Sequence, residues 1–327
     1  MIMENETYIK YIDYYLPENY ITVDDVFSSL DAKIFEEKNI DRDIFCSKFK
    51  KETRLDKISV LKKEDDLASI VFGMVDKLLK ETRINPQEID YLVCGNEVLL
   101  RHNNASIVHY IQKAFDFEKS TIIPLLQPCA ASLFAMGLSK SLLDEEKKNM
   151  LILTACKWEQ IEERFIDFTI RGDGIGLLLV GSDTGLLKIT GWNSCNLGDS
   201  SYNKIENKAQ GQDFRGGMIS RGVSFIEETL RKFNLEKDEI EKVIVPNVRY
   251  DVYYDVYSHY LRMNPKLFYL DNVSNGGHIC DIDIVRNLKD YLQNRKETKK
   301  HSIILYTPDV ERTFDVNYHL VLLNNAT

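Results

Sequence analysis

The sequence predicts an α/β protein built from two copies of one folding unit. The first observation is a helical pattern, a turn and an apolar strand over residues 65–99, an order that returns over residues 219–247. The second is that each copy then continues with a strand, a loop, a helix and a closing strand. A repeat of this length exceeds a solenoid unit and indicates a duplicated α/β domain. The length of 327 residues also suggests two domains, so we expect similar halves over residues 1–185 and 186–327.

The elements of the first copy follow from hydrophobic periodicity. Helices are predicted where apolar residues recur at helical spacing, and strands where apolar residues form short runs between turn residues. These elements are a helix from residue 66, strands at 90–96 and 122–126, a helix at 131–143 and a strand at 150–155.

The second copy shows the same elements in the same order. They are a helix at 219–233, strands at 242–247 and 266–270, a helix at 282–292 and a strand at 302–307. The polar, glycine-containing residues 199–218 precede this copy, and we expect them to form a long loop. Two such halves would pack about a pseudo-twofold axis, which brings their equivalent loops face to face.

Cys129 follows a predicted strand and directly precedes a predicted helix. Backbone N–H groups converge at a helix N-terminus, and the helix dipole there favours a negative charge. Because the thiolate is the reactive form of cysteine, this position predicts an activated nucleophile. The alternative is a small core residue that ends a strand, since free cysteine is often buried.

The loop equivalent to that of Cys129 in the second copy spans residues 274–280 and contains His278. Gly276 and Gly277 permit positive φ angles or a close backbone approach there. A histidine at a helix N-terminus is biased towards neutral imidazole, which suits a general base. The alternative is an ordinary loop histidine. If the repeat holds, however, it predicts a Cys–His pair of the kind that nucleophilic thiol chemistry uses.

These residues carry a family resemblance that runs along nearly the whole chain. Residues 8–17 resemble the opening strand and Leu-Pro turn of the 3-oxoacyl-ACP synthase III group of the thiolase superfamily. Residues 89–93 resemble that group's strand before the nucleophile region, residues 129–132 its nucleophile loop, and residues 171–177 its Gly-Asp-Gly segment. The resemblance implies a thiolase-like fold, in which two α/β halves pack as a five-layered αβαβα sandwich.

The chain also departs from that family's pattern. Asn247 stands where the family has its first histidine, and Asn275 begins the loop in which the family has its second polar residue. The family's closing glycine-rich loop is replaced by residues 307–312. We therefore take Asn247, Asn275 and Thr307 as candidates for substrate binding or for the oxyanion hole. Backbone N–H groups around Cys129 are further oxyanion candidates, as are those of residues 306–309, although Pro308 has no N–H to donate.

Residues 277–283 resemble a branch of these enzymes that carries a Cys-His-Asp set. Members of that branch transfer acyl groups to oxygen or nitrogen nucleophiles, often in natural-product pathways. The resemblance implies that Cys129 accepts the acyl group, that His278 is the base and that Asp283 orients His278. Asp281 is an alternative to Asp283 in this role, and it is also a candidate helix N-cap.

Two other functions remain open at this point. The first is a condensing enzyme, in which Asn247 and His278 exchange the positions that the two polar residues occupy in condensing relatives. The second is a catalytically silent partner subunit, against which the retention of both Cys129 and His278 argues.

Composition narrows the class of protein. The net charge of −9 argues against non-specific nucleic-acid binding. No apolar run reaches the roughly 18–20 residues that span a bilayer, and residues 1–6 do not resemble a signal peptide. The six cysteines show no Cys-x-x-Cys spacing, so we expect reduced thiols in the cytoplasm, without disulfides or a metal. Cys280 lies near the predicted site as a packing residue or as a redox partner.

The resemblance also implies partners. The acyl donor would be acyl-CoA or a phosphopantetheinyl acyl carrier protein, the acceptor a small molecule, and no cofactor would be tightly bound. Two basic runs lie where the family places its phosphopantetheine entrance: Lys48, Lys50 and Lys51 with Arg54, and Lys62 with Lys63. The family forms homodimers through the strand before the nucleophile loop, here residues 122–126.

Overall fold

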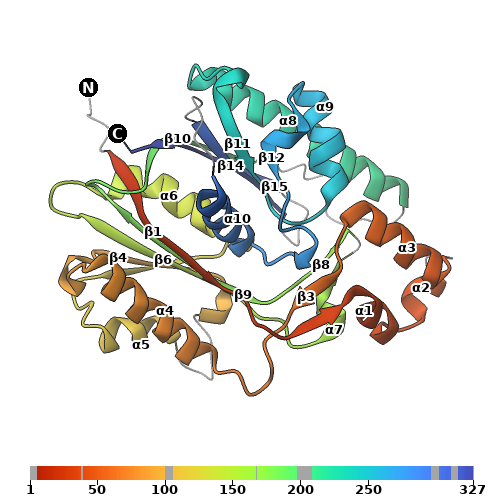
Figure 1. Cartoon of the computed structure of the whole chain (residues 1–327), viewed down its shortest axis with the longest axis horizontal. Helices are drawn as coiled ribbons and strands as arrows, with labels where there is room; N and C mark the ends of the chain where they lie inside the picture. Colours follow the sequence, from red (N-terminus) through yellow and green to blue (C-terminus); the bar gives the residue numbers. More distant parts are fainter. Residues whose placement is uncertain are drawn as a thin grey trace.

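The structure is a computed structural model of the chain. It describes residues 6–37, 40–99, 106–166, 168–196, 208–295, 302–310 and 316–326. In this part of the chain ten strands form one continuous sheet, in the order β12-β11-β14-β15-β10-β1-β9-β6-β4-β5, and its two halves lie on either side of the helices α6 (Ala131–Leu142) and α10 (Ile282–Asn294) (Figure 1). The first copy supplies β1 (Thr7–Tyr15), β4 (Tyr91–Gly95), β5 (Thr121–Leu125), β6 (Asn149–Cys156) and β9 (Gly174–Gly181). The second supplies β10 (Leu187–Asn196), β11 (Ile240–Ile244), β12 (Phe268–Tyr269), β14 (Ser302–Val310) and β15 (Val316–Asn325).

The strand order confirms the duplication. From the middle of the sheet outwards, the first half has the strands β1-β9-β6-β4-β5 and the second half has β10-β15-β14-β11-β12. At each place the two strands have the same rank in the chain order of their own half. β1 and β10 pair antiparallel, with Thr7 opposite Ile189, and this pair joins the halves. β5 and β12 are the equivalent outermost strands, so the loops that follow them are equivalent too. The boundary predicted at residues 185 and 186 falls between β9 and β10, and as a domain division it stays a prediction.

The helices add the remaining layers of an αβαβα sandwich (Figure 1). The central helices are α6 (Ala131–Leu142) and α10 (Ile282–Asn294), and α4 (Leu67–Thr82), α5 (Ile107–Ala114), α8 (Lys208–Lys232) and α9 (Ser258–Leu261) lie outside. Leu133 of α6 and Leu288 of α10 share one apolar cluster with Ile152 and Leu305 from the strands of the two halves. The central layer thus buries apolar surface from both copies, which favours their association. Among the helices described, none has the length and apolar character that a bilayer crossing requires.

An excursion between β1 and α4 was not predicted from the sequence. It contains β2 (Tyr20–Thr22), α1 (Val23–Ser29), α2 (Lys33–Glu37), α3 (Arg42–Thr53) and β3 (Lys57–Ser59). Phe27 is buried among Phe45, Phe49 and Phe165, with ring centroids 5.3–5.7 Å from its own. β3 pairs in parallel with β13 (Asn275–Gly276) of the second copy, so the excursion also joins the two halves.

Short elements complete the described fold. They are α7 (Ile161–Arg164), β7 (Phe165–Ile166), β8 (Thr169–Ile170), a π-helix at Val252–Tyr257, and 3₁₀ turns at Pro86–Glu88, Glu97–Leu99, Lys237–Glu239 and Pro265–Leu267. One expectation was wrong: α8 begins at Lys208, so residues 208–218 are helical rather than a loop. Residues 199–207 of that predicted loop lie outside the described residues.

A close backbone contact connects the halves beside His278. The N–H of His278 donates to the carbonyl of Ile170 at 2.9 Å, and the N–H of Gly172 donates to the carbonyl of His278 at 3.1 Å. Gly276 and Gly277 have φ angles of +98° and +79°, a region that glycine adopts readily. A Cβ atom on Gly172 would lie 1.9 Å from the carbonyl oxygen of Gly276. The contact therefore requires glycine at position 172, within the Gly-Asp-Gly segment.

We expect Gly172→Ala to lower the free energy of unfolding by about 1–3 kcal/mol, because the added methyl group must push the two backbones apart. Gly73→Ala is the matched control. Gly73 lies in α4 with no atom within 4 Å of an added Cβ, so this change should stabilise the protein by about 0.5–1 kcal/mol. Urea unfolding measures both effects. Equal stabilities of the two variants would contradict the tight contact at Gly172.

Candidate active site

Cys129 lies in the turn between β5 and α6, two residues before the helix begins at Ala131. The N–H groups of Ala130 and Ala131 both donate to the carbonyl of Gln127, which closes the turn. Cys129 is a partly buried residue. The structure therefore places it where the sequence pattern predicts it, just before a helix.

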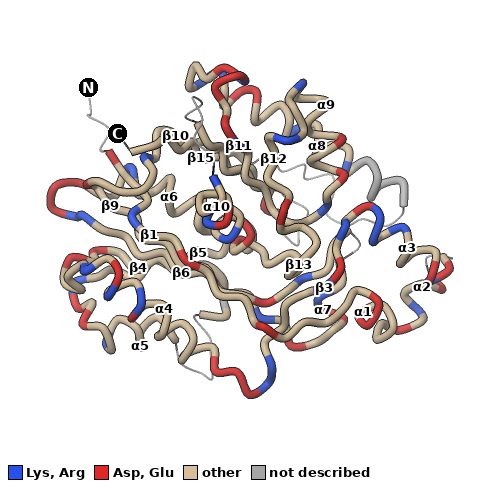
Figure 2. The backbone as a smooth tube through the Cα atoms, in the orientation of Figure 1, with Lys and Arg blue, Asp and Glu red and all other residues tan. Residues whose placement is uncertain are grey.

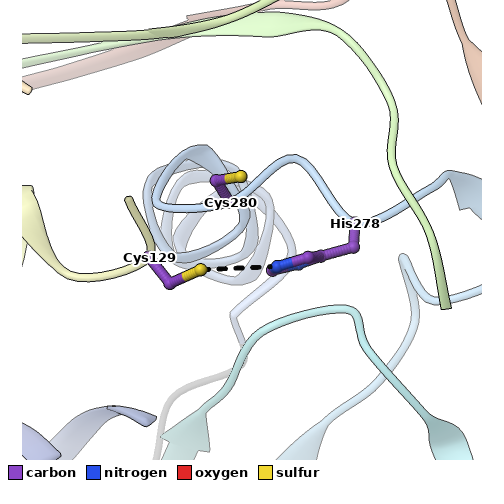
Figure 3. Close-up of side chains that lie close together, drawn as sticks. All are labelled: Cys129, His278 and Cys280. Carbon is purple, nitrogen blue, oxygen red and sulfur yellow. Dashed lines mark hydrogen bonds between the residues drawn. The ribbon is translucent and has the colours of Figure 1, made fainter. Parts of the chain in front are cut away.

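The two equivalent loops meet at this thiol. The Sγ atom of Cys129 lies 3.6 Å from Nε2 of His278, and Figure 3 shows the two side chains pointing toward one another. His278 is buried, at 5% exposure, and its main chain is held by Ile170 and Gly172. The proximity that the repeat predicts is thus present, although the two residues are 149 positions apart.

Asp283, rather than Asp281, contacts the imidazole. Its Oδ2 atom lies 2.6 Å from Nδ1 of His278. The same carboxylate accepts hydrogen bonds from the main-chain N–H groups of Asn247, at 2.8 Å, and Ile279, at 3.0 Å. Asp283 is fully buried. With Nδ1–H directed at this carboxylate, the lone pair of Nε2 faces Cys129, which is the orientation that a general base needs.

Asp281 connects the halves instead. Its carboxylate accepts from the main-chain N–H and the hydroxyl of Ser132, at 3.0 and 2.7 Å. Its own N–H donates to the carbonyl of Pro128 at 3.1 Å. Asp281 therefore satisfies an N-terminal N–H of α6, whereas no side-chain bond caps its own helix α10. Burial raises the pKa of Asp281 to about 7, because a buried carboxylate loses hydration.

The pKa values of Cys129 and His278 are both raised, whereas a position at a helix N-terminus would lower both. Contact with the Cys280 thiol and burial raise the pKa of Cys129 well above its ordinary value. Burial disfavours the His278 imidazolium, but Asp283 outweighs it, so the pKa of His278 is raised as well. One prediction was wrong: His278 does not lie at a helix start, because α10 begins only at Ile282 and His278 instead forms a strand-like bridge with Arg171. A neutral Cys129 thiol needs a neighbouring base to react, and His278 is placed to provide one.

Asp309 is a residue of this site whose side chain the sequence analysis missed. Its Oδ1 atom accepts the main-chain N–H of Cys129 at 2.9 Å, and the residue is fully buried. That N–H was a predicted oxyanion donor, and a carboxylate already holds it. Only the backbone of Asp309 was considered as a donor, because the family's glycine-rich loop has no side chain at this place.

Of the other predicted binding residues, Asn247 and Thr307 are engaged within the protein, whereas the side-chain Oδ1 of Asn275 is buried without a hydrogen-bond partner among the described residues. Nδ2 of Asn247 donates to Asp283 at 3.2 Å and to Asn287 at 3.4 Å, and its Oδ1 accepts from Asn287 at 2.9 Å. Asn275 lies in β13, and its main-chain carbonyl accepts a hydrogen bond from the Arg286 guanidinium at 2.7 Å. Thr307 is fully buried within β14, opposite His319. Its segment is therefore a strand as far as Val310 rather than a loop, and residues 311 and 312 lie outside the described residues.

A comparison with protein families matches part of the chain. Residues 16–164 match the family described as FAE1/Type III polyketide synthase-like protein. No curated protein sequence matches the chain. The matched segment contains Cys129 and ends before the second copy.

Solved structures match nearly the whole chain. ChlB3, titled an acyltransferase, superposes with a TM-score of 0.76 at 14% identity, covering 98% of this chain and 99% of that one. 3-Oxoacyl-[acyl-carrier-protein] synthase III from Aquifex aeolicus has a TM-score of 0.73 at 15% identity, covering 97% and 99%. Cerulenin-bound OleA from Xanthomonas campestris has a TM-score of 0.77 at 10% identity, covering 98% and 99%. These similarities show the thiolase-like fold of the 3-oxoacyl-ACP synthase III type.

We expect Asp283→Asn to lower the pKa of His278, because the Asp283 carboxylate stabilises the imidazolium and an amide does not. The neutral imidazole would then persist to lower pH than in the unaltered protein. An NMR titration of the His278 ring measures the change. His319, whose pKa burial lowers to about 4, provides an internal reference that this substitution should leave unchanged. An unchanged pKa of His278 would show that Asp283 does not set its protonation.

Proposed function

We propose that this chain, which has the 3-oxoacyl-ACP synthase III form of the thiolase fold, is an acyltransferase that uses Cys129 as a covalent nucleophile. The observation that carries the proposal is the sequence of contacts from Cys129 to His278 and from His278 to Asp283, at 3.6 and 2.6 Å. A thiol, an adjacent base and a group that orients the base are the parts that nucleophilic thiol catalysis requires.

The first half-reaction loads the enzyme. Nε2 of His278 takes the proton of the Cys129 thiol, and the sulfur attacks the carbonyl carbon of an acyl thioester. The tetrahedral intermediate collapses and breaks the bond to the donor's sulfur, which leaves as a thiol with the proton from His278. The products are acyl-Cys129 and the free thiol of CoA or of a phosphopantetheinyl carrier protein.

The second half-reaction transfers the acyl group. His278 removes a proton from an alcohol or amine acceptor, whose oxygen or nitrogen attacks the thioester carbonyl. The Cys129 sulfur leaves and regains its proton from His278. Asp283 keeps the imidazole oriented in both steps, and Asn247 in turn positions Asp283 through the two hydrogen bonds between them. A role in natural-product biosynthesis fits this chemistry.

The surface near α3 bears on the acyl donor. Figure 2 shows basic residues in the segment that carries α3, which includes Lys48, Lys50 and Lys51. Lys48 lies 3.7 Å from Glu52 and Lys50 lies 2.8 Å from Asp24. These exposed pairs are weak, so both lysines remain able to meet the phosphates of CoA or the acidic surface of a carrier protein.

We also propose that the chain forms a homodimer through β5. This strand is the outer strand of the first half, and none of its residues is fully buried. Leu126, directly after it, is 60% exposed. An exposed apolar sheet edge favours pairing with a second copy.

Decarboxylative condensation is the second candidate, and the match of residues 16–164 to a polyketide synthase-like family favours it. Condensation requires two polar groups on the carbonyl of a malonyl thioester. His278 can provide one of them. The amide of Asn247, however, is engaged by Asp283 and Asn287, so the second group is not available in this arrangement.

Incubation with a panel of acyl thioesters should add one acyl group to the protein, and Cys129→Ala should abolish the adduct. Cys94 is the internal control: it is buried in β4, and burial raises the pKa of its thiol to about 11. Intact mass spectrometry and peptide mapping locate the adduct. An adduct on Cys280, or on no cysteine, would overturn the assignment of Cys129.

His278→Ala should slow acyl transfer from preformed acyl-Cys129 by about a hundredfold or more, because a general base is lost. Asn247→Ala should slow it only by about tenfold, the loss of a supporting hydrogen bond worth roughly 1–1.5 kcal/mol. Single-turnover kinetics with a fixed acceptor distinguish the two variants. Similar rates for both variants would remove His278 from the proposed role.

Asp309→Asn should accelerate acylation of Cys129 by about tenfold, because it removes a buried negative charge that lies close to Cys129, where the oxyanion of the tetrahedral intermediate develops. Asp309→Glu keeps the charge and is the control. Burst-phase acylation rates with one thioester measure the effect. A slower Asp309→Asn variant would mean that the carboxylate assists acylation rather than opposing it.

Labelled malonyl-CoA separates the two candidate functions. We expect no steady CO₂ release, since transfer to oxygen or nitrogen involves no decarboxylation. CO₂ release coupled to a new carbon–carbon bond would favour the condensing enzyme instead.

A further inference from the structure

The site contains a third heteroatom ligand that the proposed acyl transfer does not use. Cys280 lies two residues after His278 and is buried, at 4% exposure. Figure 3 shows its side chain beside the facing pair of Cys129 and His278. The Sγ atoms of the two cysteines and a ring nitrogen of His278 all lie within 4.8 Å of one another.

We propose that Cys129, His278 and Cys280 form a binding site for a soft divalent cation such as Zn²⁺. Two thiolates and an imidazole are ligands that zinc prefers, and three protein ligands leave its fourth position open. The bond lengths of about 2.3 Å to sulfur and 2.0–2.1 Å to nitrogen place two tetrahedral ligands about 3.6 Å apart. The distance from Sγ of Cys129 to Nε2 of His278 is 3.6 Å, so this pair already has the required separation.

The surroundings of His278 also fit a metal ligand. Metal-bound histidines usually donate their other ring N–H to a carboxylate, which fixes the tautomer and the ring orientation. Asp283 provides such a partner at 2.6 Å from Nδ1, and Nε2 is thereby left to coordinate the cation. Cys280 has a φ angle of +51°, an uncommon backbone conformation for a residue other than glycine. The chain holds Cys280 in this conformation where its sulfur can join the site.

Binding balances in charge and protons. The cation takes the place of the two thiol protons of Cys129 and Cys280, which are released to solvent, while His278 binds as neutral imidazole. The resulting site has no net charge among the cation and its three ligands, which suits a buried location. The sulfur of Cys129 cannot hold the cation and an acyl group together, so metal binding and acylation exclude one another.

The test uses Co²⁺ as a spectroscopic probe of the reduced full-length protein, without any thioester. We expect thiolate-to-cobalt charge-transfer absorption and the visible bands of tetrahedral cobalt, both abolished by Zn²⁺. Cys280→Ser should weaken cobalt binding at least about a hundredfold. Loss of a residue that only hydrogen-bonds a metal ligand already lowers metal affinity by about 10–100-fold, and Cys280 would be a ligand itself. Cys46→Ser, which alters a cysteine in α3 far along the chain from the site, should bind as the unaltered protein does.

A second measurement avoids any doubt about folding of the variant. Alkylation of Cys129 with iodoacetamide in the unaltered protein should abolish the cobalt bands as well. Absence of the bands, or bands unchanged in Cys280→Ser or after alkylation of Cys129, would overturn the metal site. Because no thioester takes part, a protein that binds cobalt but accepts no acyl group would contradict only the proposed function.

Discussion

The backbone contact between the Gly-Asp-Gly segment and the loop of His278 is the constraint on which the candidate site depends. Gly172 and Gly276 approach so closely that a Cβ atom on Gly172 would overlap a carbonyl oxygen. The hydrogen bonds of Ile170 and Gly172 hold the main chain of His278 from both sides. The imidazole therefore has little freedom, and its distance from Cys129 is set by how the two halves pack.

Three buried carboxylates lie around this contact, and each holds a different group. Asp283 fixes the imidazole, Asp281 satisfies the N-terminus of α6 from the opposite half, and Asp309 holds the N–H of Cys129. The bonds that the Asp281 carboxylate accepts from Ser132, and that the Asp309 carboxylate accepts from Cys129, connect residues from different copies of the repeat. Stability and chemistry thus rely on the same interface, and a change in the packing of the halves would alter both.

The sequence predicted much of this correctly because its signals are local or periodic. The repeat of helix, turn and strand patterns gave the duplicated fold and the equivalence of the loops after residues 126 and 270. The glycine pair before His278 indicated positive φ angles, which the structure has. By contrast, polar residues 208–218 suggested a loop although they continue a helix, because composition alone does not show what that segment packs against.

The sequence by itself determined the α/β class, the duplication, and the position of Cys129 just before a helix in a loop equivalent to that of His278. Only the tertiary structure decided which aspartate contacts His278, that Asp309 holds the N–H of Cys129, and that the sulfur of Cys280 lies beside Cys129 and His278. The absence of Cys-x-x-Cys spacing had suggested no metal. Spacing along the chain, however, does not describe ligands that come from two different halves. The physical reason is that periodicity records which face of an element is buried, whereas contacts between side chains far apart in the sequence arise only when the halves pack.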